Sequence, residues 1–141
     1  VYFLSSGYSD SEYYHHLTKE YEGNKIVMAP EFTMNTGISY TQAIKSSLFK
    51  SFTATTSVTG FGTQYFDEAN TMKQDPYFLW NMDLGISGKH IDFHVWGKNI
   101  LDKNFFCYMF NSPVGNNLPE YMKSGQSGAP SRFGASITIK L

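Results

Sequence analysis

Three side chains in the second half of the chain have the types and spacing of a metal site. His90, Asp92 and His94 alternate with apolar residues, so a β-strand would place all three on one face. Imidazole and carboxylate groups are ligands of transition metals. A strand face wetted by water needs the same residue types, so both interpretations stay open. His15 and His16 are a second pair of candidates, either for a metal chelate or haem or as ordinary polar loop residues.

Other reactive residues do not form a catalytic pattern. Asp67, Glu68 and Asp75 lack the spacing of a calcium loop and have no neighbouring base. The sequence contains no GxSxG, no Ser/His/Asp signature and no phosphate-binding glycine loop. Cys107 is the single cysteine and has no partner at metal-ligand spacing. We therefore expect no enzyme activity and no bound cofactor.

The composition describes one domain or part of one. The chain has 141 residues, of which 41% are apolar and 17% aromatic, with a formal net charge of −1. The aromatic share argues against disorder, and the neutral balance excludes the basic surface that nucleic acid requires. No stretch approaches the ~18 apolar residues of a membrane helix. A mean hydropathy of −0.32 suits a soluble protein and equally a transmembrane β-barrel, whose strands alternate apolar and polar residues.

Apolar residues recur at every second position, which is the period of a β-strand. The two clearest stretches are Glu31 to Thr41 and Tyr77 to Ser87, and we expect further strands at residues 1–13, 48–61, 90–96 and 132–141. No window has a 3.6-residue apolar stripe, so the pattern predicts an all-β, antiparallel fold of about six strands. The apolar side of the two clearest strands consists of Phe32, Met34, Ile38, Tyr40, Phe78, Trp80, Met82, Leu84 and Ile86.

The links between these strands alternate between long and short. Residues 15–29, 62–76 and 101–130 are long links, whereas residues 42–47 and the Gly88-Lys89 pair are short. This order places every long link at one end of the sheet, as in outer-membrane barrels, which have short periplasmic turns and long extracellular loops. The clearest strands also have roughly the 9 to 11 residues needed to cross a bilayer. We therefore expect the apolar side to face lipid.

Four segments, in this order and spacing, resemble the C-terminal part of the β-barrel of a TonB-dependent outer-membrane receptor or transporter. They are Gly23-Asn24-Lys25 with Ala29-Pro30-Glu31, residues 65–70 (YFDEAN) with 73–77 (KQDPY), residues 95–103 (VWGKNILDK), and residues 128–134 (GAPSRFG). Two positions depart from the family pattern. Members usually end in Phe where this chain has Leu141, and Ser131 stands between Pro130 and Arg132.

The resemblance implies that residues 1–141 are the C-terminal portion of a 22-stranded barrel. The plug domain, which occupies such barrels and engages the TonB complex, and the earlier strands would lie outside this chain. Six strands cannot close a barrel, because the smallest have eight. The chain begins at Val1 without a starting Met or a signal peptide, so we expect a fragment. The resemblance also implies a signal for the outer-membrane assembly machinery in the last strand, formed by Arg132, Gly134, Ile137, Ile139 and Leu141.

The implied function is active uptake of a scarce nutrient across the outer membrane of a Gram-negative bacterium. An iron chelate, either a siderophore or haem, or cobalamin would be the small-molecule nutrient. Its candidate contacts are the loop aromatics Phe105, Phe106, Tyr108, Phe110 and Tyr121, which could equally pack against neighbouring loops. Two alternatives remain. One is a soluble β-sandwich that binds carbohydrate or protein, and the other is a passive outer-membrane barrel without a plug.

Overall fold

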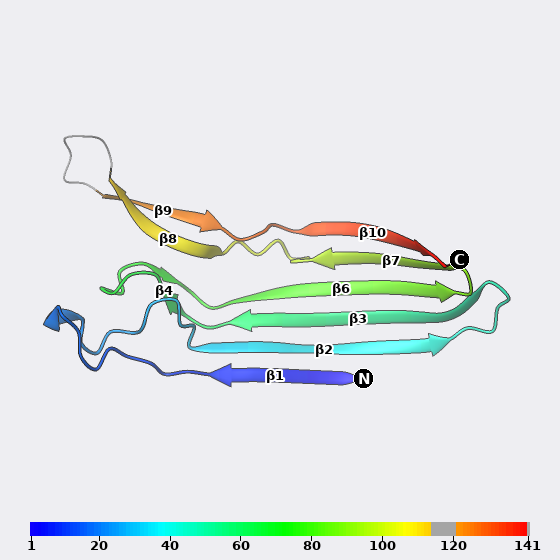
Figure 1. Cartoon of the computed structure of the whole chain (residues 1–141), viewed down its shortest axis with the longest axis horizontal. Coiled ribbons are helices and arrows are strands. Elements are labelled where there is room, and N and C mark those ends of the chain that lie inside the picture. The colour runs from blue at the N-terminus through cyan, green and yellow to red at the C-terminus, as the bar shows by residue number, and fades with distance from the viewer. Residues whose placement is uncertain (114–120, 141) are drawn as a thin grey trace.

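The computed structural model describes residues 1–113 and 121–140. Six antiparallel strands form one sheet: β1 (Tyr2–Tyr8), β2 (Phe32–Ala43), β3 (Phe49–Phe61), β6 (Tyr77–Gly88), β7 (Ile91–Lys98) and β10 (Arg132–Ile139). Their order in the sheet follows their order in the chain, so each strand pairs with its predecessor in the sheet. Figure 1 shows them as a single gently curved layer.

All the long connections lie at one end of this sheet, which we call the loop end (Figure 1). Loop 1 is residues 9–31 and contains a short 3₁₀ helix, η1 (Lys19–Tyr21). Loop 2 is residues 62–76 and contains the small strands β4 (Gln64–Tyr65) and β5 (Lys73–Gln74). Loop 3 is residues 99–131 and contains β8 (Phe106–Pro113) and β9 (Tyr121–Ser127). The opposite end carries the short connections β2–β3 and β6–β7, and we call it the turn end.

The pairing register divides the sheet into an apolar and a polar face. Directly paired residues share a face, and the register aligns Met34 with Gly60, Val58 with Trp80 and Leu84 with Val95. Followed across all six strands, the apolar face contains every sequence-predicted apolar position of β2 and β6. It is completed by Tyr2, Leu4, Tyr8, Phe52, Ala54, Val58, Ile91, Phe93, Val95, Phe133, Ala135, Ile137 and Ile139.

Glycine allows large rings to lie across neighbouring strands. A Cβ atom on Gly60 would come within 2.7 Å of the Phe78 ring on the apolar face, and one on Gly134 would lie 2.4 Å from the Trp96 indole on the polar face. Both rings therefore occupy space that any larger residue would fill. At both positions the absence of a side chain leaves room for the neighbouring ring, and the backbone pairing of the sheet continues through the glycine.

The sheet has no core of its own. Among the described residues the buried apolar side chains are Phe66, Met72 and Tyr77, which lie in loop 2 and at the loop end of β6. The accessible area is 9952 Å², whereas a compact monomer of this mass exposes about 7,400 Å². The excess is the uncovered sheet, because the described residues place no second layer over either face.

The strand predictions agree closely with this fold, with two differences. Strands β2, β3, β6, β7 and β10 begin and end within two residues of their expected bounds. Strand β1 stops at Tyr8 instead of continuing to Tyr13, because β2 begins at Phe32, the pairing partner of Tyr8. The link at 101–130 contains the β8–β9 hairpin, whose second strand, rich in Ser, Gly and Gln, lacks the apolar alternation of the other strands. Among the described residues, no helix is long and apolar enough to cross a membrane.

Candidate functional site

The loop end is the part of the molecule where side chains from distant segments meet. Loop 1 is held closed by pairing of residues 11–13 with residues 24–26, including a bridge between Glu12 and Lys25. Loop 2 is a hairpin in which β4 pairs with β5. Loop 2 contacts both loop 1 and loop 3, so it connects the three loops.

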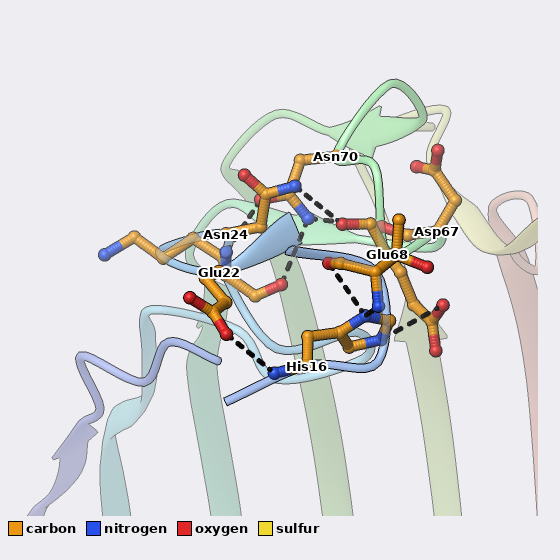
Figure 2. Close-up of polar contacts among 8 residues, drawn as sticks. His16, Glu22, Asn24, Asp67, Glu68 and Asn70 are labelled. Atoms are coloured by element: carbon orange, nitrogen blue, oxygen red, sulfur yellow. Dashed lines mark hydrogen bonds and ion pairs between the residues drawn. The ribbon is translucent and has the colours of Figure 1, made fainter. Parts of the chain in front are cut away.

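Asn70 joins loop 1 to loop 2, because its side-chain amide bonds to the backbone of Lys25 in the way that the backbone of a neighbouring β-strand would. Its side-chain Oδ1 accepts a hydrogen bond from the backbone N–H of Lys25 at 2.7 Å, and its Nδ2 donates to the backbone carbonyl of Lys25 at 3.0 Å. Asn24 adds a bond in the other direction, from its Nδ2 to the carbonyl of Glu68 at 2.7 Å. Figure 2 shows these two asparagines between the two loop ribbons. The amide groups therefore fix the backbone of loop 1 to that of loop 2.

Asp67 shapes the turn that presents Asn70. Its carboxylate accepts hydrogen bonds from the backbone N–H groups of Thr71 and Met72, at 3.2 and 2.7 Å, and from the Thr71 hydroxyl. Asn70 has a φ of 55°, a left-handed conformation that asparagine tolerates better than most residues. The carboxylate thus has a structural task in the turn.

His16 and His15 lie in different surroundings. His16 is 15% exposed, and its Nε2 lies 3.4 Å from the Glu68 carboxylate (Figure 2). Its Nδ1 lies 3.0 Å from the Thr18 backbone nitrogen and 3.2 Å from the Thr18 carbonyl oxygen. His15 is 83% exposed and 3.6 Å from Glu22. The two imidazoles therefore contact different carboxylates.

Lys25 on loop 1 and Lys73 on loop 2 each form ion pairs with neighbouring carboxylates. Lys25 bonds to Asp10 and to Glu12, and these hydrogen bonds, with Asp10 the stronger influence, raise the pKa of Lys25 above its ordinary value. Lys73 on loop 2 bonds to Asp75 at 2.9 Å, which raises the pKa of Lys73 in the same way. Both lysines therefore stay charged at physiological pH.

Loop 3 docks on loop 2 through aromatic and polar contacts. The Phe105 ring stacks on Tyr77 with centroids 4.5 Å apart, and Tyr108 meets Phe66 edge-on at 6.2 Å. The Phe106 backbone N–H donates to the Gln74 side chain at 2.8 Å, and Lys123 donates to the Thr71 carbonyl at 3.1 Å. Phe66 and Tyr77, which make the aromatic contacts, and nearby Met72 are buried.

The five aromatic residues of loop 3 that the sequence suggests as ligand contacts lie in different surroundings. Phe105 is a packing residue at the base of the hairpin. Phe106, Tyr108 and Phe110 remain 39 to 43% exposed, and the rings of Tyr108 and Phe110 stack on each other with centroids 5.9 Å apart. The side chain of Tyr121 lies outside the described residues. Tyr108 and Phe110 therefore offer one accessible aromatic surface, while the bulge after Phe106 puts that ring over Gly125 on the opposite face of the hairpin.

The expected strand triad does not converge on one point. His90 precedes β7 and Asp92 bonds to Lys140 at 2.8 Å, while His94 lies 3.4 Å from Asp83. Within the described residues, no three His, Cys, Asp or Glu side chains come together as a group that could hold a metal ion. Asp92 and His94 therefore have separate partners, and the wetted strand face stays a prediction.

Asn99 closes the base of loop 3, a role that the sequence analysis did not assign. It is 4% exposed with a φ of 49°. Its Nδ2 donates to the carbonyls of Lys103 and Ala129, at 3.0 and 3.1 Å, and its Oδ1 accepts from the Lys103 backbone N–H. Asp102 accepts from the Ser131 backbone N–H at 2.8 Å. Asparagine directly after a strand in an Asn-x-x-Asp pattern is the sequence signal for such a left-handed corner.

The last strand divides its predicted signal residues between the two faces. Arg132 and Gly134 lie on the polar face, and Ile137 and Ile139 lie on the apolar face with about two thirds of their area exposed. Leu141 lies outside the described residues. The alternation expected from the sequence is therefore present, while its reading by an assembly machinery stays a prediction.

Comparison with known proteins gives one line of evidence for the fold. No protein-family model matches the chain. The structure is similar to the crystal structure of the ferric yersiniabactin uptake receptor FyuA from Yersinia pestis, with a TM-score of 0.71 and 18% sequence identity over 84% of this chain. The chain spans about 17% of the length of that receptor. The predicted fold class is thus confirmed: an all-β, antiparallel sheet of six strands that matches a segment of a receptor barrel.

Proposed function

We propose that this chain forms part of the wall and mouth of a TonB-dependent receptor in the outer membrane of a Gram-negative bacterium. One observation carries the proposal. A largely apolar face extends across all six strands, nothing in the described residues covers it, and the long loops all lie at one end. A bilayer supplies the missing apolar surroundings, and outer-membrane barrels have this asymmetry of loops.

The few polar groups on the apolar face support contact with lipid. Trp80 donates its indole N–H to the Thr56 hydroxyl at 2.6 Å, and the Thr36 hydroxyl donates to the carbonyl of Phe3 at 3.2 Å. A polar group without a partner is costly in hydrocarbon. Both threonines can therefore be tolerated on a face that meets lipid, because their hydroxyls are already bonded.

The opposite face is suited to a wet lumen. Hydroxyl groups pair across β2 and β3, between Ser39 and Thr55 at 2.9 Å and between Thr41 and Thr53 at 3.3 Å. Most of the remaining positions of this face are small, polar or charged, with large apolar side chains at Phe3, Phe61, Tyr77, Leu79 and Trp96. Such a face is stable in contact with water or with a polar domain in the lumen.

The open edges support the assignment of residues 1–141 as the last six strands of a larger barrel. Strands β1 and β10 each have one unpaired side, and free backbone groups in lipid cost several kcal/mol each. Pairing with earlier strands of the same protein removes that cost. On this proposal the plug and the TonB-engaging segment belong to the same protein outside this chain, and the assembly machinery reads β10.

We assign the cargo to the class of iron chelates, siderophore or haem, with cobalamin as the second candidate. Support comes from the exposed, stacked rings of Tyr108 and Phe110 at the loop end, which suit a partly flat, apolar solute. The described function of the structural neighbour, ferric yersiniabactin uptake, belongs to the same class.

Growth under iron starvation tests this assignment. The full-length gene is expressed in a Gram-negative strain lacking its own chelate receptors, and growth is measured with a panel of ferric siderophores, haem or, in a separate auxotroph, cobalamin. We expect growth on at least one nutrient, and loss of that growth when TonB is deleted. Growth that persists without TonB would favour the passive barrel and contradict the proposal.

The sandwich alternative has less support. It requires a second sheet packed over the apolar face, and in the described residues β4–β5 and β8–β9 both lie at the loop end (Figure 1). A partner supplied by another protein would be needed to complete such a sandwich.

A further inference from the structure

The turn end is the basic end of the molecule. Its residues, 42–51, 86–92 and 138–140, include four lysines and one acidic residue, Asp92. The three loops at the opposite end contain ten Asp or Glu residues and five lysines. Asp92 is already bonded to Lys140 at 2.8 Å. The charge of the chain is therefore divided along the strand direction, and Lys45, Lys50 and Lys89 carry the positive charge of the turn end.

These three lysines are exposed and belong to two adjacent turns. Lys45 lies in the β2–β3 connection, Lys50 lies at the bulge where β3 begins, and Lys89 lies in the β6–β7 turn. The two turns are in contact, because the Lys89 backbone N–H donates to the Leu48 carbonyl at 3.3 Å. Within residues 1–113 and 121–140, no carboxylate forms an ion pair with any of the three.

A recess between the two turns joins these cations to the apolar face. It is lined by Ser47, Leu48, Phe49, Lys89, His90 and Ile91. Phe49 pairs with Gly88 and Ile91 pairs with Ile139, so the register places both side chains at the margin of the apolar face. Leu48 is 68% exposed. The recess therefore combines apolar walls with a cationic rim, which is the complement of an amphiphile with an anionic head.

We propose that the turn end binds an anionic phospholipid of the leaflet that faces the periplasm, with its phosphate at the three lysines and one acyl chain along Leu48, Phe49 and Ile91. This inference rests on the proposed function in one respect, since it needs the apolar face to lie in the outer membrane. A lipid is favoured over free phosphate or an acidic protein because the cations stand directly at the edge of that apolar face. Close to anionic lipid, each lysine changes the affinity roughly fivefold, and salt screens little within a Debye length of about 8 Å.

Native mass spectrometry of the full-length protein tests this lipid site. The protein is transferred from detergent into mixed micelles with equal amounts of phosphatidylglycerol and phosphatidylcholine, and the retained lipids are counted. We expect a several-fold excess of phosphatidylglycerol, and equal retention of the two lipids would refute the site. Inorganic phosphate in excess should leave the lipid bound. Complete displacement by phosphate would show a site for the free anion and refute the role of the acyl chain.

A triple variant locates the bound headgroup. Lys45→Gln, Lys50→Gln and Lys89→Gln together should lower the retention of phosphatidylglycerol by about tenfold or more. The same three positions changed to arginine should retain the lipid, because the positive charges are preserved. Retention that is unchanged in the glutamine variant would place the lipid elsewhere on the protein and overturn the proposal.

A second triple variant is the matched control for net charge. Lys19→Gln, Lys98→Gln and Lys103→Gln remove three exposed lysines at the loop end and should leave the retention unchanged. Equal loss in both triple variants would show a response to net charge alone and contradict a site at the turn end.

A leucine pair tests the apolar part of the recess. Leu48→Ser should lower the retention of phosphatidylglycerol several-fold without any change in charge, because it removes apolar contact with the chain. Leu17→Ser is the control, since Leu17 is fully exposed in loop 1, and it should have no effect. Equal retention in the two variants would refute the acyl-chain contact.

The outcomes for the lipid site and for transport are distinguishable. A protein that retains phosphatidylglycerol through the turn-end lysines but imports no nutrient would refute the transport assignment and leave the lipid site intact. TonB-dependent import by a protein that retains both lipids equally would refute the lipid site alone.

Discussion

At the scale of single residues, the side of the sheet decides what each side chain contacts. Met82 lies on the apolar face, paired directly with Gly97, and Ser57 lies on the polar face one position from Thr56, the partner of Met82 on β3. The two positions therefore share a depth but face different media. A substitution that adds charge should therefore cost much more at Met82 than at Ser57.

We predict that Met82→Lys in the full-length protein weakens folding into lipid bilayers by about 2–4 kcal/mol, the cost of a lysine facing lipid near mid-depth. Ser57→Lys at the same depth should cost far less, because its ammonium group reaches the lumen. Urea titrations of folding into vesicles, read by heat-modifiable gel mobility, measure both. If Ser57→Lys were the more damaging change, the assignment of the two faces would be reversed.

Asn99 gives a second prediction at this scale. Asn99→Ala removes three hydrogen bonds at a buried corner with positive φ, so we expect a loss on the order of 2–3 kcal/mol in the same titration. Asn99→Gly should recover part of this, since glycine adopts positive φ without strain. Exposed Asn104 provides the matched control, Asn104→Ala, with little effect. Equal stability of Asn99→Ala and Asn104→Ala would show that the corner does not depend on the amide.

At the scale of elements, loop 2 is the connector of the mouth. Its Asn70 bonds to the backbone of loop 1, its Glu68 carbonyl accepts a bond from Asn24 of loop 1, and it supports loop 3 through Phe66 and Gln74. The sheet itself takes no part in the loop 1 to loop 2 contact. Loosening that contact should therefore alter the loops and leave the strands unchanged.

We predict that Asn70→Ala accelerates hydrogen exchange at the Lys25 backbone amide by about tenfold, because a hydrogen bond contributing roughly 1.4 kcal/mol is lost. Amides in the middle of β3 serve as the internal control and should exchange at an unaltered rate. Mass spectrometry of the full-length protein in detergent resolves the two peptides. Unchanged exchange at Lys25 would mean that loop 1 holds its place without Asn70, while faster exchange in β3 would show a global effect.

The sequence predicted the strands well and the loop contacts poorly, for one physical reason. Alternation is a local property, so the clearest strands, at Phe32–Ala43 and Tyr77–Gly88, could be read with nearly correct bounds. The bond between Asn70 and Lys25 joins residues 45 positions apart, and no local pattern encodes it. The same limit explains why His90, Asp92 and His94 were open to a metal interpretation, since Asp92 and His94 bond to Lys140, just after β10, and to Asp83 on β6.

At the scale of the whole molecule, the exposed area sets the conditions under which residues 1–141 can hold this fold. The described residues leave both edges of the sheet and one entire apolar face uncovered. Exposed strand edges next to apolar surface promote association between chains.

Isolated residues 1–141 should therefore aggregate in plain buffer, and detergent alone should leave the edges unpaired. We predict that monomeric β-structure returns when the chain is refolded in detergent together with the preceding strands of the same protein, as measured by circular dichroism and light scattering. A monodisperse, β-rich sample of residues 1–141 in buffer would mean that the apolar face is covered by protein, and the membrane assignment would then be wrong.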